Sequence, residues 1–189
     1  MIKMRHGLQK RAGRFRREKS GAIAIEFAFI FPLLIVVYLG VVEIGNALAA
    51  SRKVTLLTGT VADIISQYDE ISKSDLDKIF LATTEILRPF SADSSNLRIE
   101  VFSITVDDED AQVESWPGKV SNGGNCGNSN APAPVVPANL LADKGSIIVA
   151  KVCYGYQSVL HHFFSGATSF NEIFYIRPRH VDAVSWQSG

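Results

Sequence analysis

The chain has 189 residues, with 19 basic and 19 acidic side chains. This length leaves room for one domain of about 100 to 140 residues beside a membrane anchor, which excludes a large enzyme with a second sizeable core. The charge is divided unequally, because residues 1–21 contain eight basic residues and one acidic residue, a net charge of +7, and the remainder carries −7. A basic tail is therefore joined to an acidic body.

The basic tail directly precedes a long apolar segment. Residues 27–42 contain no charged side chain and make about 24 Å of helix, and the wider segment 22–50 makes about 43 Å. A hydrocarbon core is about 30 Å thick, so the wider segment is long enough to cross it. Basic residues before a single span indicate a cytoplasmic N-terminus rather than a nucleic-acid-binding tail. The body after residue 50 is then extracytoplasmic.

Two simple interpretations of the apolar segment are a cleaved secretory signal and a plain signal anchor. Small residues at 47–51 resemble a signal cleavage site, but the apolar core exceeds the usual length of about 7 to 15 residues, and Glu43 separates it from that site. A plain anchor accounts for the length of the apolar segment and for the basic residues that precede it. It does not account for Glu26, since a carboxylate inside an apolar run is costly unless it is paired or reaches the interface.

The residues around Glu26 resemble a type IV prepilin signal. Gly21 ends the basic leader, Glu26 is the fifth residue after it, and Phe27 is the sixth. The resemblance implies that a membrane prepilin peptidase cuts on the cytoplasmic side between Gly21 and Ala22, where a glycine lets the backbone lie extended in a narrow cleft. The new α-amino group at Ala22 would be largely cationic at neutral pH. Glu26, about 6 Å further along the helix, could pair with such an amine of a neighbouring subunit.

The longer stretch 16–50 resembles the TadE/TadG-like family, minor pseudopilin relatives of the tight-adherence (Tad/Flp) pilus. Its members combine a basic leader, a glycine–alanine step, a glutamate–phenylalanine pair, a proline-containing apolar run and a final glycine with a glutamate. The matching residues here are Gly21, Ala22, Glu26, Phe27, Ala28, Pro32, Leu33, Leu34, Gly40 and Glu43.

This family resemblance implies a single-pass protein of the bacterial inner membrane with a periplasmic C-terminal domain. Its implied function is assembly of a Tad/Flp type IV pilus, used for adhesion and surface attachment. The implied partners are the prepilin peptidase, other Tad pilus subunits and assembly-platform proteins. Catalytic activity, cofactors, metals, small-molecule substrates and nucleic acid are not expected. The alternative is an unprocessed, membrane-anchored periplasmic sensor or binding domain in which Glu26 is incidental.

We expect three parts in the chain: a cytoplasmic leader at 1–21, a transmembrane helix at 22–50, and an extracytoplasmic α+β domain at 51–189 with a flexible loop at 117–139. Apolar residues recurring every three or four positions predict that the first helix continues beyond the membrane. These residues are Val54, Leu57, Val61, Ile64, Ile65, Tyr68 and Ile71.

A second helix is predicted within residues 72–90. Ser74 is its expected N-cap, Asp75 and Asp77 lie in its first turn, and it should stop before Pro89.

Period-two alternation predicts three strands after the helices. They cover 97–106, 146–157 and 172–186, the last broken or placed at an edge because of Pro178. Helices followed by strands indicate an α+β fold with a small antiparallel sheet, a pilin-like plan.

The body contains two cysteines, Cys126 in the Gly/Asn/Pro-rich loop and Cys153 in a predicted strand. An extracytoplasmic location favours a disulfide between them, with two free thiols as the alternative. His161 and His162 are adjacent and cannot converge on one metal, and the acidic run 107–110 lacks the pattern of a calcium loop. Both are expected to be surface turns.

Overall fold

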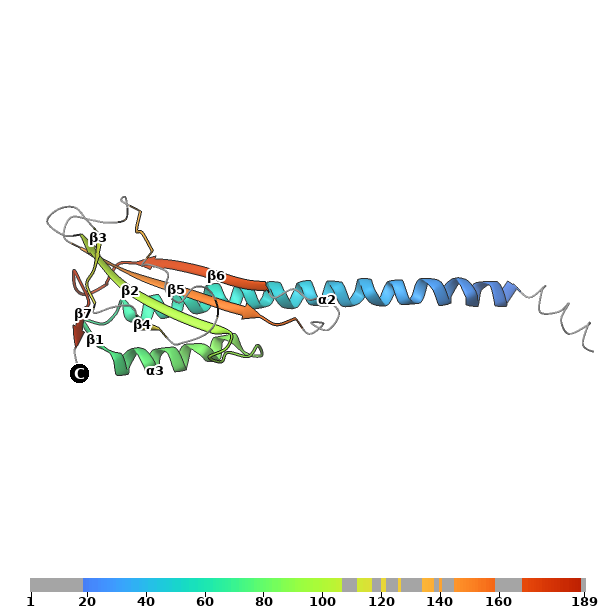
Figure 1. Cartoon of the computed structure of the whole chain (residues 1–189), viewed down its shortest axis with the longest axis horizontal. Coiled ribbons are helices and arrows are strands. Elements are labelled where there is room, and N and C mark those ends of the chain that lie inside the picture. Colours follow the sequence, from blue (N-terminus) through green and yellow to red (C-terminus); the bar gives the residue numbers. More distant parts are fainter. Residues whose placement is uncertain are drawn as a thin grey trace, which may run out of the picture. The chain divides into compact units, whose positions relative to one another are not determined.

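The structure is a computed structural model that falls into two compact units, Met1–Gly45 and Asn46–Gly189. The expected α+β class is confirmed: a long N-terminal apolar helix, a second helix and a small antiparallel sheet are present (Figure 1). The described residues are 19–106, 112–116, 120–121, 126, 134–137, 140, 145–158 and 168–187. The histidines at 161 and 162 and the acidic run 107–110 lie outside them.

Helix α2 (Lys19–Ile65) continues past residue 50, as its apolar periodicity predicts. In the second unit its fully buried positions recur every three or four residues, so one face of the helix packs into the core. The last turn tightens, since the Gln67 N–H bonds to the Ile64 carbonyl at 3.2 Å. The helix ends at Ile65, so the predicted helical repeat is wrong for its last two residues: Tyr68 is exposed and Ile71 lies in a short strand, Glu70–Ser72. The buried positions are Ala50, Val54, Leu57, Val61, Ala62 and Ile65.

A short strand, β1 (Glu70–Ser72), leads directly into helix α3 (Lys73–Thr84) and a 3₁₀ turn, η1 (Glu85–Leu87). The predicted N-cap, Ser74, is wrong, because Ser72 caps this helix. Strand pairing with β7 (Ser185–Gln187) holds the Ser72 backbone extended, at φ −105° and ψ 164°, as an N-cap requires.

Helix α3 begins with a capping box, in which two reciprocal hydrogen bonds each join a backbone N–H to a side chain. The Asp75 N–H donates to the Ser72 hydroxyl oxygen and the Ser72 N–H donates to the Asp75 carboxylate, both at 3.3 Å. The Ser72 hydroxyl also donates to this carboxylate at 2.6 Å, and it lowers the pKa of Asp75 below its ordinary value of 3.8. Because the folded pKa is depressed, the cap stabilises the helix at neutral pH and loses this contribution as the pH falls below about 3.8.

The main sheet has five antiparallel strands in the order β3–β2–β5–β6, and β4 also pairs with β2 (Figure 1). The predicted strands at 97–106 and 146–157 are confirmed. The predicted strand at 172–186 is broken around Pro178 as expected, and its second part, β7, joins β1 in a separate parallel pair. The strands are β2 (Leu97–Val106), β3 (Gln112–Glu114), β4 (Val120–Ser121), β5 (Ser146–Tyr156) and β6 (Thr168–Ile176).

One face of the sheet packs against both helices. The register pairs Ile99 with Val152 and Val101 with Ala150, so the alternating apolar residues of β2 and β5 share this face. They form one core with the buried faces of α2 and α3. The Trp116 indole N–H donates to the Val184 carbonyl at 2.9 Å, and its ring lies 5.5 Å from that of Trp186. The two tryptophans therefore report on the attachment of the C-terminal strand.

The opposite face of the sheet is buried too, which its alternation pattern does not predict. Phe102, Ile104, Ile147 and Val149 form a second apolar cluster there with Val136. In β2 and β5, this cover leaves little solvent-facing room for charged residues on the second face, whereas most of β6 is at least partly exposed.

A charged group lies on this second buried face. Glu100 is 1% exposed and is paired across the strands with Lys151. The Lys151 Nζ lies 3.4 Å from Glu100 Oε2, and the Arg98 Nη1 lies 3.8 Å from Glu100 Oε1. Two cations therefore flank one buried carboxylate, a role that the sequence pattern alone did not single out.

Candidate functional site

The apolar part of α2 in the first unit has no protein cover. Residues 21–39 are all exposed, and the apolar side chains are distributed around the whole circumference of the helix rather than along one stripe. Such a helix is stable when hydrocarbon or other helices surround it. Within the described residues, one helix is long and apolar enough to cross a membrane, and its candidate span begins at Gly21. This segment is a membrane anchor.

The proposed cleavage position lies at the start of this helix. Gly21 and Ala22 follow Lys19, the first helical residue, so the bond between them is in the first turn. No atom lies within 4 Å of the place where a Gly21 Cβ would stand, so packing within the described chain does not require a glycine there.

Glu26 lies one turn beyond Ala22 on the same side of the helix, since residues four apart are neighbours on a helix surface. Its side chain is exposed, and it contacts no hydrogen-bond or ion-pair partner among the residues that the structure describes. Phe27 is 59% exposed and stacks on Phe31, with the ring centroids 5.4 Å apart. The helix thus presents a carboxylate beside an aromatic pair, surrounded by apolar surface, which suits a contact with a cationic group of another chain.

Part of the sequence matches the model of a known protein family. Residues 21–62 match the model of the family described as TadE-like protein. Over these residues the chain is similar to that family, and we call them the TadE-like segment. The match begins at Gly21 and ends within α2, so it covers the uncovered apolar stretch and part of the amphipathic continuation. The family resemblance drawn from the sequence is confirmed over these residues. No curated protein and no solved structure gives a significant match.

The TadE-like segment contains the four residues to which the sequence analysis gave a role in cleavage or assembly, Gly21, Ala22, Glu26 and Phe27, and neither cysteine. No group of three or more His, Cys, Asp or Glu side chains in the described part of the chain is arranged to hold a metal ion.

Outside the TadE-like segment, Cys126 and Cys153 form a disulfide in the structure, with their Cα atoms 5.6 Å apart. Both are buried, and Cys153 on β5 is paired with Arg98 of β2. The bond joins residues 27 positions apart in the sequence. A cross-link of this span restricts the unfolded chain and contributes about 3 kcal/mol in the chain-entropy model.

Reduction of this disulfide is expected to lower the free energy of unfolding by about 3 kcal/mol. The measurement is denaturant unfolding followed by tryptophan fluorescence, with and without reductant. A Cys126→Ser, Cys153→Ser double variant serves as control, since reductant should not change its unfolding midpoint. Labelling of both cysteines by a thiol reagent in denaturant without reductant would show two free thiols and contradict the expectation.

Proposed function

We propose that this protein is a TadE-like minor pilin or pseudopilin that acts in the assembly of a Tad/Flp type IV pilus, in adhesion and surface attachment. Its N-terminal helix would be processed by a prepilin peptidase between Gly21 and Ala22 and would then pack with the helices of other pilus subunits and of the assembly platform. The protein would have a structural role, without catalytic activity or cofactor.

One observation carries this proposal: the family match begins at Gly21 and covers the helix that the protein itself leaves uncovered. A helix that is apolar on all sides supports a role in lipid and in helix packing. Glu26 supports a more specific role than anchoring, because an ionisable group inside such a helix is costly without a partner. The amine exposed at Ala22 of a neighbouring subunit would be that partner.

The proposed topology places the basic leader in the cytoplasm and the second unit in the periplasm. The leader carries a net charge of +7, and the positive-inside tendency keeps such segments on the cytoplasmic side of the bacterial inner membrane. The disulfide between Cys126 and Cys153 is consistent with an oxidising periplasm.

The mature N-terminus tests the proposed processing. Protein isolated from cells with an active prepilin peptidase is expected to begin at Ala22, which intact mass and N-terminal sequencing measure directly. In the control variant Gly21→Val, a β-branched side chain at the scissile bond should block the cleft, and the protein should begin at Met1. Recovery of the unaltered chain with Met1 intact would instead favour an unprocessed, membrane-anchored periplasmic sensor or binding domain.

A further inference from the structure

Strand β6 forms an open edge of the main sheet. It pairs with β5 on one side, and in the part of the chain that the structure describes its other side makes no backbone hydrogen bond. β6 has nine residues, with Glu172 as its one charged side chain and without proline. Unpaired N–H and C=O groups along such a strand are a template for another strand.

The other side of the sheet is closed in a different way. There β2 pairs with two strands of three and two residues, β3 and β4. Very short strands are a common way to protect an edge, as are charged residues and prolines within it. The sheet therefore has one protected edge and one long, unprotected edge.

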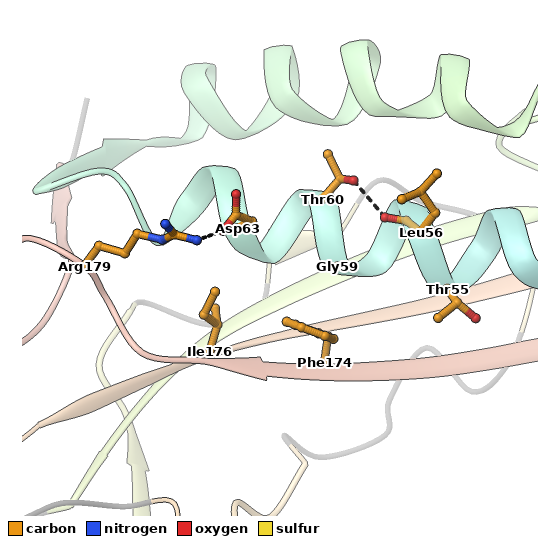
Figure 2. A pocket seen from close by; sticks show the side chains of 8 residues that line it. All are labelled: Thr55, Leu56, Gly59, Thr60, Asp63, Phe174, Ile176 and Arg179. Atoms are coloured by element: carbon orange, nitrogen blue, oxygen red, sulfur yellow. Dashed lines mark hydrogen bonds and ion pairs between the residues drawn. The ribbon is translucent and has the colours of Figure 1, made fainter.

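An open groove of about 450 Å³ lies between this edge and helix α2 (Figure 2). Its β6 wall carries Phe174, which is 41% exposed, and Ile176. On the α2 side Leu56 is 60% exposed and Gly59 leaves space, with the ring of Phe174 3.9 Å from where a Gly59 Cβ would stand. The groove therefore lies where the inward side chains of a strand added next to β6 would meet α2.

The polar groups that line the groove already have partners. The Thr60 hydroxyl donates to the Leu56 carbonyl at 2.8 Å, and the Thr55 hydroxyl donates to the Ser51 carbonyl at 3.2 Å. Asp63 and Arg179 form an ion pair with each other at one end of the groove (Figure 2). Each of these side chains therefore already has a partner within the chain, whereas the outer backbone groups of β6 have none among the described residues.

We propose that the β6 edge and this groove form a docking site for an extended strand of another protein. The strand would add to the sheet through backbone hydrogen bonds to β6 and place apolar side chains, at alternate positions, against Leu56, Gly59 and Phe174. This mode requires an extended chain, because only a backbone supplies donors and acceptors at the spacing of a strand. The proposal is independent of N-terminal processing, since the groove belongs entirely to the second unit.

Charge favours a neutral or basic strand from a different protein over a second copy. Residues 46–189 contain 16 acidic and 11 basic residues, a net charge of −5, so two copies repel each other. Glu172 near the middle of β6 would also approach its own counterpart in a centred antiparallel pair, and like charges directly opposite each other are destabilising.

The test uses the full chain in detergent micelles and a synthetic peptide as long as β6, of alternating valine and threonine with a lysine at each end. Hydrogen exchange should slow about tenfold or more in the β6 amides when this peptide is bound. A peptide with glutamate at both ends should bind more weakly, and one that is N-methylated at alternate residues should not bind. The matched variants are Gly59→Ala, whose methyl group makes only ordinary contacts, and Gly59→Leu, whose side chain fills the groove.

Gly59→Ala is expected to keep the affinity, and Gly59→Leu is expected to lose about tenfold or more. Neither variant should lower the unfolding midpoint, because alanine and leucine are better helix formers than glycine. Four results would overturn the proposal. The first is an unchanged rate of hydrogen exchange in the β6 amides at millimolar peptide. The second and third are binding of the N-methylated peptide as tight as that of the unmodified one, and equal affinity of the two Gly59 variants for the peptide. The fourth is a dimer of the chain without peptide, seen in sedimentation, that protects the β6 amides and is lost in Gly59→Leu.

Discussion

Glu26→Ala is expected to leave processing after Gly21 largely intact and to abolish pilus assembly. The cleavage position is five residues away, so the peptidase can still bind the glycine and the basic leader. The carboxylate, in contrast, has no partner among the described residues of its own chain, and the proposed assembly role assigns it the α-amino group of a neighbouring subunit. Loss of that pair would leave the amine uncompensated in an apolar surrounding, at a cost of several kcal/mol per contact.

The measurements are the mature mass, the number of surface pili and attachment to a solid surface, compared between the variant and the unaltered chain. Glu26→Gln serves as an isosteric control that removes the charge and keeps the shape, so it should fail in assembly as Glu26→Ala does. Glu26→Asp keeps the charge on a shorter side chain and should recover part of the assembly. Normal piliation by Glu26→Ala would refute a pairing role for this carboxylate.

Glu100→Ala is expected to destabilise the second unit by about 3 to 5 kcal/mol. The side chain is 2% exposed, and its removal would take away the carboxylate that lies 3.4 Å from the Lys151 ammonium on a largely buried face. A buried charge that loses its partner keeps its full desolvation cost. Removing one member of a buried ion pair therefore destabilises a protein more than replacing the whole pair with apolar residues does.

Denaturant unfolding followed by fluorescence of Trp116 and Trp186 measures this effect, because their ring contact depends on the folded second unit. Glu85→Ala is the matched control. It breaks a carboxylate pair with Arg88 at 2.6 Å whose side chains are 61% and 78% exposed, so its expected cost is below about 1 kcal/mol. The double variant Glu100→Ala, Lys151→Met should recover part of the loss by removing one uncompensated cation. Equal costs for Glu100→Ala and Glu85→Ala would contradict the assignment.

Features set by neighbours in the chain could be predicted from the sequence. The membrane segment, its TadE-like character and the continuation of α2 past residue 50 depend on hydropathy and on a period of three to four residues, both of which are local. The strands β2 and β5 follow from period-two alternation in the same way. The candidate residues at the start of α2 are likewise defined by spacing within six positions of Gly21.

Features set by distant pairings could not be predicted. Ser72 with Asp75 and Ser74 with Asp77 have the same spacing, and only the pairing of β1 with β7, more than 110 positions away in the sequence, selects Ser72 as the cap. Alternation along β2 likewise cannot indicate that Glu100 is buried, nor that Val136 joins an apolar cluster on the second face of the sheet.

By itself, the sequence determined the anchor, the position of Glu26 five residues after Gly21, and the order of the two α-helices and the longer strands, because each depends on residues within a few turns of one another. The short strands β1, β3 and β4 were not predicted. Only the tertiary structure decided the open edge of β6 and the groove beside it. That site brings residues 55–63 of α2 against residues 174–179, more than 110 positions later, and such a contact exists only after the sheet has packed on the helix.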